Sequence, residues 1–101
     1  MEEFFRLRLA QLRIQKNVSA RDMSLSLGQS ESYINKIESG KAFPSMQVFF
    51  YICDYFDITP KDFFDTENKN PAALEELVND IKALTDKQVA SIAYIVRELK
   101  R

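Results

Sequence analysis

Apolar residues recur three and four positions apart along most of this sequence, and no stretch alternates cleanly between apolar and polar residues. A spacing of three and four places side chains on one face of an α-helix, whereas alternation would place them on one face of a β-strand. The chain has 101 residues, a length that suits one domain with a short appendage. The pattern therefore predicts an all-α domain with an extension.

Seven helices are expected from capping residues and from residues that stop a helix. The first covers about residues 2–16 and ends at Asn17, a residue type that tolerates the left-handed conformation, as does Asp57. The second and third helices end at the only two glycines, Gly28 and Gly40. The expected starts of helices two to seven are Ser19, Ser30, Ser45, Thr59 with Pro60, Asn70 with Pro71, and Thr85, which forms a capping box with Gln88.

The composition indicates a filled core and excludes several kinds of site. Hydrophobic residues make up 46% of the chain, which has no His and a single Cys. A zinc site of Cys and His ligands and an internal disulfide are therefore excluded, no cofactor is expected, and Cys53 is expected to be a buried thiol. No nucleophile stands beside a base, so an enzyme is not expected. No segment reaches the roughly 20 apolar residues of a membrane span, so a soluble cytoplasmic protein is expected.

The net charge of −1 and the pI near 5.4 do not by themselves indicate a nucleic-acid-binding protein, for which a pI above about 9 is typical. The positive charge is local instead. Residues 4–16 contain no acid and four basic residues, which are Arg6, Arg8, Arg13 and Lys16. A basic first helix of this kind favours binding to DNA.

A very short turn at Gly28 separates the second and third expected helices, which is the spacing of a helix-turn-helix. Further landmarks follow one another from about Leu9 to Phe64: "LR" at 12–13, "S" at 19, "LG" at 27–28, "SYINKIESGK" at 32–41, "PS" at 44–45 and "ITPKDFF" at 58–64. With these landmarks the sequence resembles the phage repressor and Cro type of helix-turn-helix regulator, the Xre family. The resemblance implies a five-helix lambda-repressor-like DNA-binding domain whose third helix enters the major groove.

The resemblance also implies roles for single residues. Arg13 and Glu38 are similar to an ion pair that bridges the first helix to the end of the third, with two independent surface charges as the alternative. The residues expected to contact bases are Ser30, Glu31, Ser32, Asn35 and Lys36. The residues expected to contact phosphates are Ser19, Ala20, Tyr33, Ser39, Lys41 and Ser45.

Three positions depart from the family pattern. Ala20 and Glu31 stand where the family usually carries Gln, and Phe43 takes a loop position that is often polar. An acid at position 31 repels the phosphate backbone. Two interpretations therefore remain open: a sequence-specific transcriptional regulator, expected to be a repressor, or an antitoxin-like or antirepressor-like protein-interaction module that keeps the fold and binds DNA weakly or not at all.

Three segments are expected: a helix-turn-helix domain at 1–64, a polar linker at 65–70 and a helical hairpin at 71–101. The hairpin carries apolar residues at heptad-like spacing. These apolar faces are expected to pack against each other, against the main domain or against a second subunit. The expected partners are double-stranded DNA and a second copy of the chain, and a regulatory protein is left open. Phe43, Tyr51 and Tyr55 belong either to a second contact or to the core. The residues expected to form the dimer are Leu77, Ile81, Ile92, Val96 and Leu99.

Overall fold

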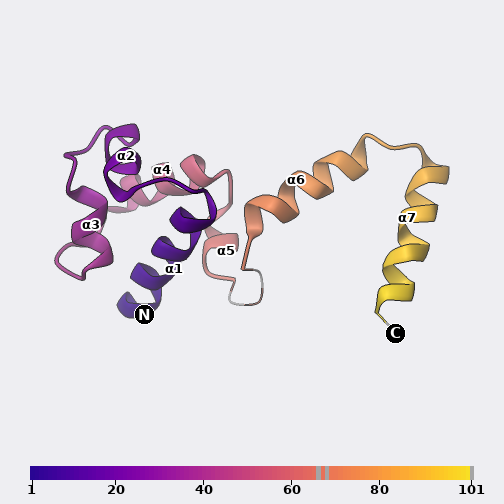
Figure 1. The fold of residues 1–101 in the computed structure, drawn as a ribbon, viewed down its shortest axis with the longest axis horizontal. Helices are drawn as coiled ribbons and strands as arrows, with labels where there is room; N and C mark the ends of the chain where they lie inside the picture. The colour runs from indigo at the N-terminus through magenta and orange to yellow at the C-terminus, as the bar shows by residue number, and fades with distance from the viewer. Residues whose placement is uncertain (66, 68, 101) are drawn as a thin grey trace.

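A computed structural model describes residues 1–65, 67 and 69–100 of the chain. Every regular element in these ranges is an α-helix, which confirms the predicted all-α class. Figure 1 shows the first five helices as one compact group, from which the last two extend as an arm. The predicted linker and hairpin include residues 66, 68 and 101, which lie outside the described residues. The helices are α1 Glu2–Gln15, α2 Ala20–Ser26, α3 Tyr33–Glu38, α4 Met46–Phe56, α5 Pro60–Phe63, α6 Pro71–Lys82 and α7 Asp86–Leu99.

The ends of most helices follow the predicted local chemistry. The left-handed residues Asn17 (φ 60°) and Asp57 (φ 58°) follow the ends of α1 and α4, as predicted. Each observed side-chain cap accepts a hydrogen bond from a backbone N–H three residues later, which satisfies a donor that the first turn leaves unpaired. The capping residues are Ser19, Ser45, Thr59, Asn70 and Thr85.

The core lies where the first five helices meet. Phe5, Phe49 and Phe63 form its aromatic centre, with ring centroids 4.9 to 5.7 Å apart. Cys53 is only 2% exposed, as predicted, and burial raises the pKa of its thiol to about 11. Buried apolar residues around this centre are Leu9, Leu12, Met23, Ile34, Ile37, Ile52, Phe56 and Ile58.

The arm begins inside the five-helix group and then leaves it. Pro71 is buried and Ala72 packs against the core, while the side chain of Gln15 donates a 2.5 Å hydrogen bond to the carbonyl of Lys69. From Leu74 onward the large apolar side chains of α6 and α7 are mostly exposed, and the two helices diverge rather than lie side by side (Figure 1). No helix in the described ranges is both long enough and apolar enough to cross a membrane.

Candidate nucleic-acid interface

A buried serine fixes α3 against α2. Ser24 is fully buried, and its hydroxyl donates to the carbonyl of Ala20 (2.7 Å) and accepts from the backbone N–H of Ile34 (3.0 Å). The second bond satisfies one of the donors at the start of α3 from a neighbouring helix. The role of Ser24 is not predictable from the sequence, because a serine inside a helix has no local signal that identifies its partner.

The start of α3 differs from the prediction. Ser30 does not cap the helix, which begins at Tyr33 after Ser32, and no side-chain cap bond is present there. Instead the carbonyl of Ser30 accepts from the N–H of Tyr33 at 3.0 Å and forms a turn. Since Ser24 already satisfies the N–H of Ile34, the helix does not need the predicted cap. Ser30, Glu31 and Ser32 therefore lie in the turn before α3 rather than on its first turn.

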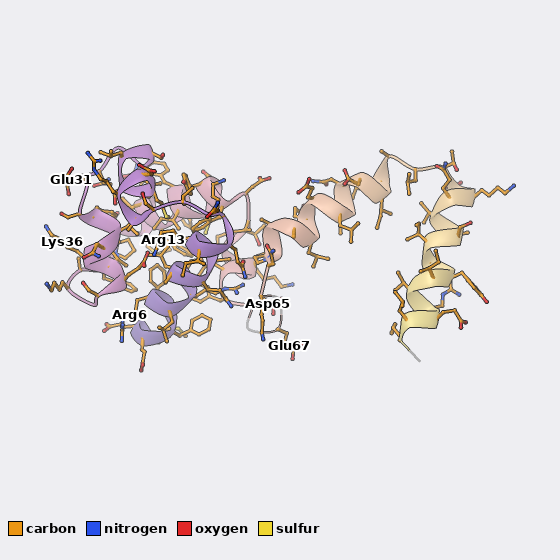
Figure 2. All side chains as sticks on the ribbon, viewed as in Figure 1. Arg6, Arg13, Glu31, Lys36, Asp65 and Glu67 are labelled. Carbon is orange, nitrogen blue, oxygen red and sulfur yellow. The ribbon has the colours of Figure 1, made fainter. Side chains whose placement is uncertain are left out.

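The outward face of α3 is polar and accessible. Asn35 and Lys36 are exposed, whereas Ile34 and Ile37 on the opposite face are buried in the core. Figure 2 shows Glu31 and Lys36 on the same outer side of the domain. The structure thus brings three of the residues predicted to contact bases to one side of the molecule.

The residues predicted to contact phosphates lie at the ends of α2, α3 and α4. Gly40 adopts a φ of 81° and ends α3, and the N–H of the exposed Lys41 donates to the carbonyl of Lys36 at 2.8 Å. The Ser39 hydroxyl donates to that same carbonyl at 3.2 Å. Ser19 and Ser45 use their oxygens as helix caps, which leaves each hydroxyl proton available to a phosphate oxygen.

Ala20 and Tyr33 are half-buried and pack against the core. The side chain of Ala20 therefore points at least partly inward, and only its backbone is suited to a phosphate. Burial raises the pKa of the Tyr33 phenol, which stays a neutral hydroxyl. The half-burial of Tyr33 favours packing under the helix over the phosphate contact expected from the sequence.

Arg13 and Glu38 form the ion pair that the resemblance implied. The Nε and Nη2 groups of Arg13 donate to the two carboxylate oxygens of Glu38 at 2.7 and 3.0 Å, and its Nη1 donates to the carbonyl of Val18 at 2.9 Å. The two side chains are only 18% and 15% exposed. The hydrogen bonds to Glu38 raise the pKa of Arg13, so its guanidinium stays charged. This arrangement ties α1 and the α1–α2 link to the end of α3.

The basic residues of α1 do not all face solvent. Arg8 is 4% exposed and donates from Nε and Nη2 to the carbonyls of Phe63 and Asp62 at 2.7 and 2.9 Å. Burial lowers its pKa. Arg8 therefore holds α5 against α1, because the last carbonyls of α5 need donors. Arg6 contacts the carbonyl of Glu38 at 3.3 Å and remains partly exposed near the end of α3.

A second ion pair spans the open side of the helix-turn-helix. The Nε of Arg21 donates to Oε2 of Glu31 at 3.1 Å, and both side chains are 67% exposed. Glu31 was among the residues predicted from the sequence to contact DNA, and Arg21 was not. The ten-residue separation gives no helical or strand register, so only the packing of α2 beside the turn reveals the pair.

The residues predicted to form the dimer lie along the arm. Leu77, Ile92, Val96 and Leu99 are 53%, 37%, 49% and 79% exposed, while Ile81 is half-buried. An apolar groove of about 310 Å³ lies between the end of α6 and α7; its lining is Ile81, Val89, Ile92, Ala93, Val96, Arg97 and Lys100. Neither the main domain nor the other helix of the arm covers most of these side chains within one chain.

The fold and this surface define a helix-turn-helix protein with a two-helix extension. A family model described as a helix-turn-helix domain matches residues 7–69, and the chain belongs to that family. The chain is also similar to the HTH-type transcriptional activator BcrR of Enterococcus faecalis, with 26% identity over 98 residues, 90% of this chain and 48% of that protein. The chain thus spans about half the length of this relative. No solved structure matches it significantly.

Proposed function

We propose that this chain is a sequence-specific DNA-binding transcription regulator of the phage repressor and Cro type, the Xre family. The observation that carries the proposal is the exposed polar face of α3 at Asn35 and Lys36, on a helix whose other face is buried. Arg13 and Ser24 anchor both ends of that helix to the domain. A helix held in this way presents its side chains to a major groove in one orientation.

Roles follow from position. Lys36 donates to guanine and Asn35 pairs with adenine, which are the contacts that their side chains make best in a major groove. Lys41, Ser39 and Ser45 contact phosphates beside the end of α3, and Ser19 and the backbone of Ala20 do so at the start of α2. Ser30 and Ser32 contact bases or the adjacent backbone from the turn. The segment 1–64 is the DNA-binding domain in this proposal.

Two observations support DNA binding over the protein-interaction alternative. The charge of Glu31 is matched by Arg21, so the acid is not an isolated negative charge facing phosphates. Ala20 packs partly against the core, so its short side chain contributes to packing rather than to a DNA contact. The two departures from the family pattern that favoured the alternative thus have local explanations.

The segment 71–101 is the dimerisation element in this proposal, and two copies bind a palindromic site with half-sites about 34 Å apart. The exposed apolar residues of α6 and α7 support a second copy as their partner, since large apolar patches on a monomer usually mark an interface. Phe43 and Tyr51 are 59% and 47% exposed and contribute to a second contact between the two copies. Tyr55 is half-buried and packs against the core instead.

Binding to a pool of random DNA duplexes across a salt series tests the proposal. We expect one palindrome to be enriched, with an affinity that falls steeply as salt rises. Lys36→Ala should relax the preference at one base position, and Lys41→Ala should weaken all sequences alike. Lys61→Ala, on the exposed surface of α5, is the matched control and should change neither. Failure of the folded dimer to enrich any sequence at low salt would contradict the proposal.

We propose repression as the regulatory outcome, because a dimer on an operator that overlaps a promoter blocks polymerase. The relative named above is called an activator, and that name describes a protein about twice as long. A reporter gene placed behind the enriched palindrome distinguishes the two outcomes. Expression should fall when the chain is present, and a rise would identify an activator instead.

A further inference from the structure

The ion pair joins Arg21, in the first turn of α2, to Glu31, in the turn before α3. Glu31 lies on the outer side of the domain that also carries Lys36 (Figure 2). An ion pair with both side chains 67% exposed contributes little to folding, because solvent screens it. Its main effect is therefore on the charge and the side-chain geometry of this surface. The pair sets the direction of one guanidinium and cancels one carboxylate.

The hydrogen bond to Glu31 uses only the Nε–H of Arg21. Within the described residues, the terminal Nη1 and Nη2 groups of Arg21 make no hydrogen bond. A guanidinium held through Nε keeps a rigid fork of donors directed away from the carboxylate, and such a fork fits two oxygens of a phosphate. In a helix-turn-helix the helix before the reading helix crosses the DNA backbone, so a phosphate is the group that Arg21 meets.

We infer that Arg21 binds a phosphate of the DNA backbone and that Glu31 is a positioning residue that holds its side chain for this contact. This inference rests on the proposed DNA-binding function, and it replaces a base contact by Glu31 with an indirect role. It also explains how the Glu31 carboxylate is compatible with DNA, because Glu31 contacts the Arg21 guanidinium, and Arg21 in turn contacts the DNA phosphate.

The inference predicts opposite effects of one substitution in two backgrounds. In the native chain, Glu31→Gln should weaken binding several-fold although it removes a negative charge, because Arg21 loses its orientation. In the Arg21→Ala chain, the same Glu31→Gln change should strengthen binding, because the carboxylate then only repels phosphates. Arg21→Ala alone should weaken binding by up to about tenfold for all sequences alike and lower the salt slope by about one.

Titration of the enriched palindrome and of a scrambled duplex measures these effects, with thermal unfolding of each variant to show that the fold is retained. Arg21→Lys keeps the charge without the fork and should restore only part of the lost affinity. Two results would overturn this inference and leave the proposed DNA-binding function intact. One is that Glu31→Gln strengthens binding in both backgrounds. The other is that Arg21→Ala leaves the affinity unchanged while Lys41→Ala lowers it. A wild-type chain that enriches no sequence overturns the proposed function and this inference together.

Discussion

Two arginines of α1, five residues apart, stabilise the fold through different partners. Arg13 meets a carboxylate on α3, and Arg8 meets two backbone carbonyls at the end of α5. Both side chains are largely shielded from solvent, so neither adds appreciably to the charge that DNA meets. At the scale of residues, the basic character of α1 serves mainly to connect helices.

Arg13→Ala should lower the free energy of unfolding by about 3 kcal/mol, because it leaves Glu38 without its partner in a partly buried position. Urea unfolding followed by circular dichroism measures the change. The matched control is Arg21→Ala, which breaks an exposed pair and should cost less than about 1 kcal/mol. Equal losses in the two variants would show that the bond to Glu38 does not stabilise the domain.

Arg8→Met should also destabilise the domain, by about 2 kcal/mol, because the carbonyl of Phe63 loses its donor and that of Asp62 keeps only backbone N–H donors. Met keeps much of the apolar volume of the arginine stem. The affinity of the folded variant for DNA and its salt slope should stay unchanged, since Arg8 is buried. A salt slope lowered by about one would instead place Arg8 at the phosphate backbone.

The helix ends control the fold at the scale of elements. α1 and α4 are each followed by a non-glycine residue with a left-handed backbone, Asn17 and Asp57. Capping boxes at Thr59 and Thr85 start α5 and α7. These signals lie within three residues of the backbone groups that they satisfy, and for that reason sequence predicts them well.

Ala at position 17 or 57 should be less stable than Gly at the same position by about 1 kcal/mol, because only Gly takes a positive φ without a steric penalty. Thermal unfolding of the four variants measures the difference. Ala10, inside α1, provides a control with the opposite sign, since Ala10→Gly should cost about 1 kcal/mol in a helix interior. Ala variants as stable as their Gly counterparts would contradict the left-handed assignment.

At the scale of the whole molecule, a buried five-helix core contrasts with an arm of exposed apolar residues (Figure 1). α7 has no buried residue. An arm of this kind is stable when a partner covers it, because isolated helices shorter than about 12 to 15 residues are marginal in water and α6 and α7 are near this limit. The dimer proposed above supplies that partner.

The combined substitutions Ile92→Asp and Val96→Asp should convert the dimer to a monomer without unfolding the five-helix core, since neither residue contacts it. Sedimentation velocity measures the change in mass. Affinity for the full palindrome should fall at least tenfold, while affinity for a half-site should stay the same. Ser91→Asp is the control, because Ser91 lies on α7 outside the residues that line the apolar groove. A double variant that remains dimeric would move the interface away from the arm.

The sequence by itself determined the helical class and most helix boundaries, and through the family resemblance it also indicated the ion pair of Arg13 with Glu38. Periodicity and capping act over a few residues, so the chain order contains the physical information that they require. The ion pair came from the resemblance, because no local rule joins residues 25 apart.

Only the tertiary structure decided the contacts that join distant helices. Arg8 meets carbonyls 54 and 55 residues away, and Ser24 and Arg21 each meet a partner ten residues away across the turn. Whether a polar side chain is a DNA contact or a structural donor depends on which backbone groups the packing leaves unpaired around it. That environment exists only after the helices have assembled.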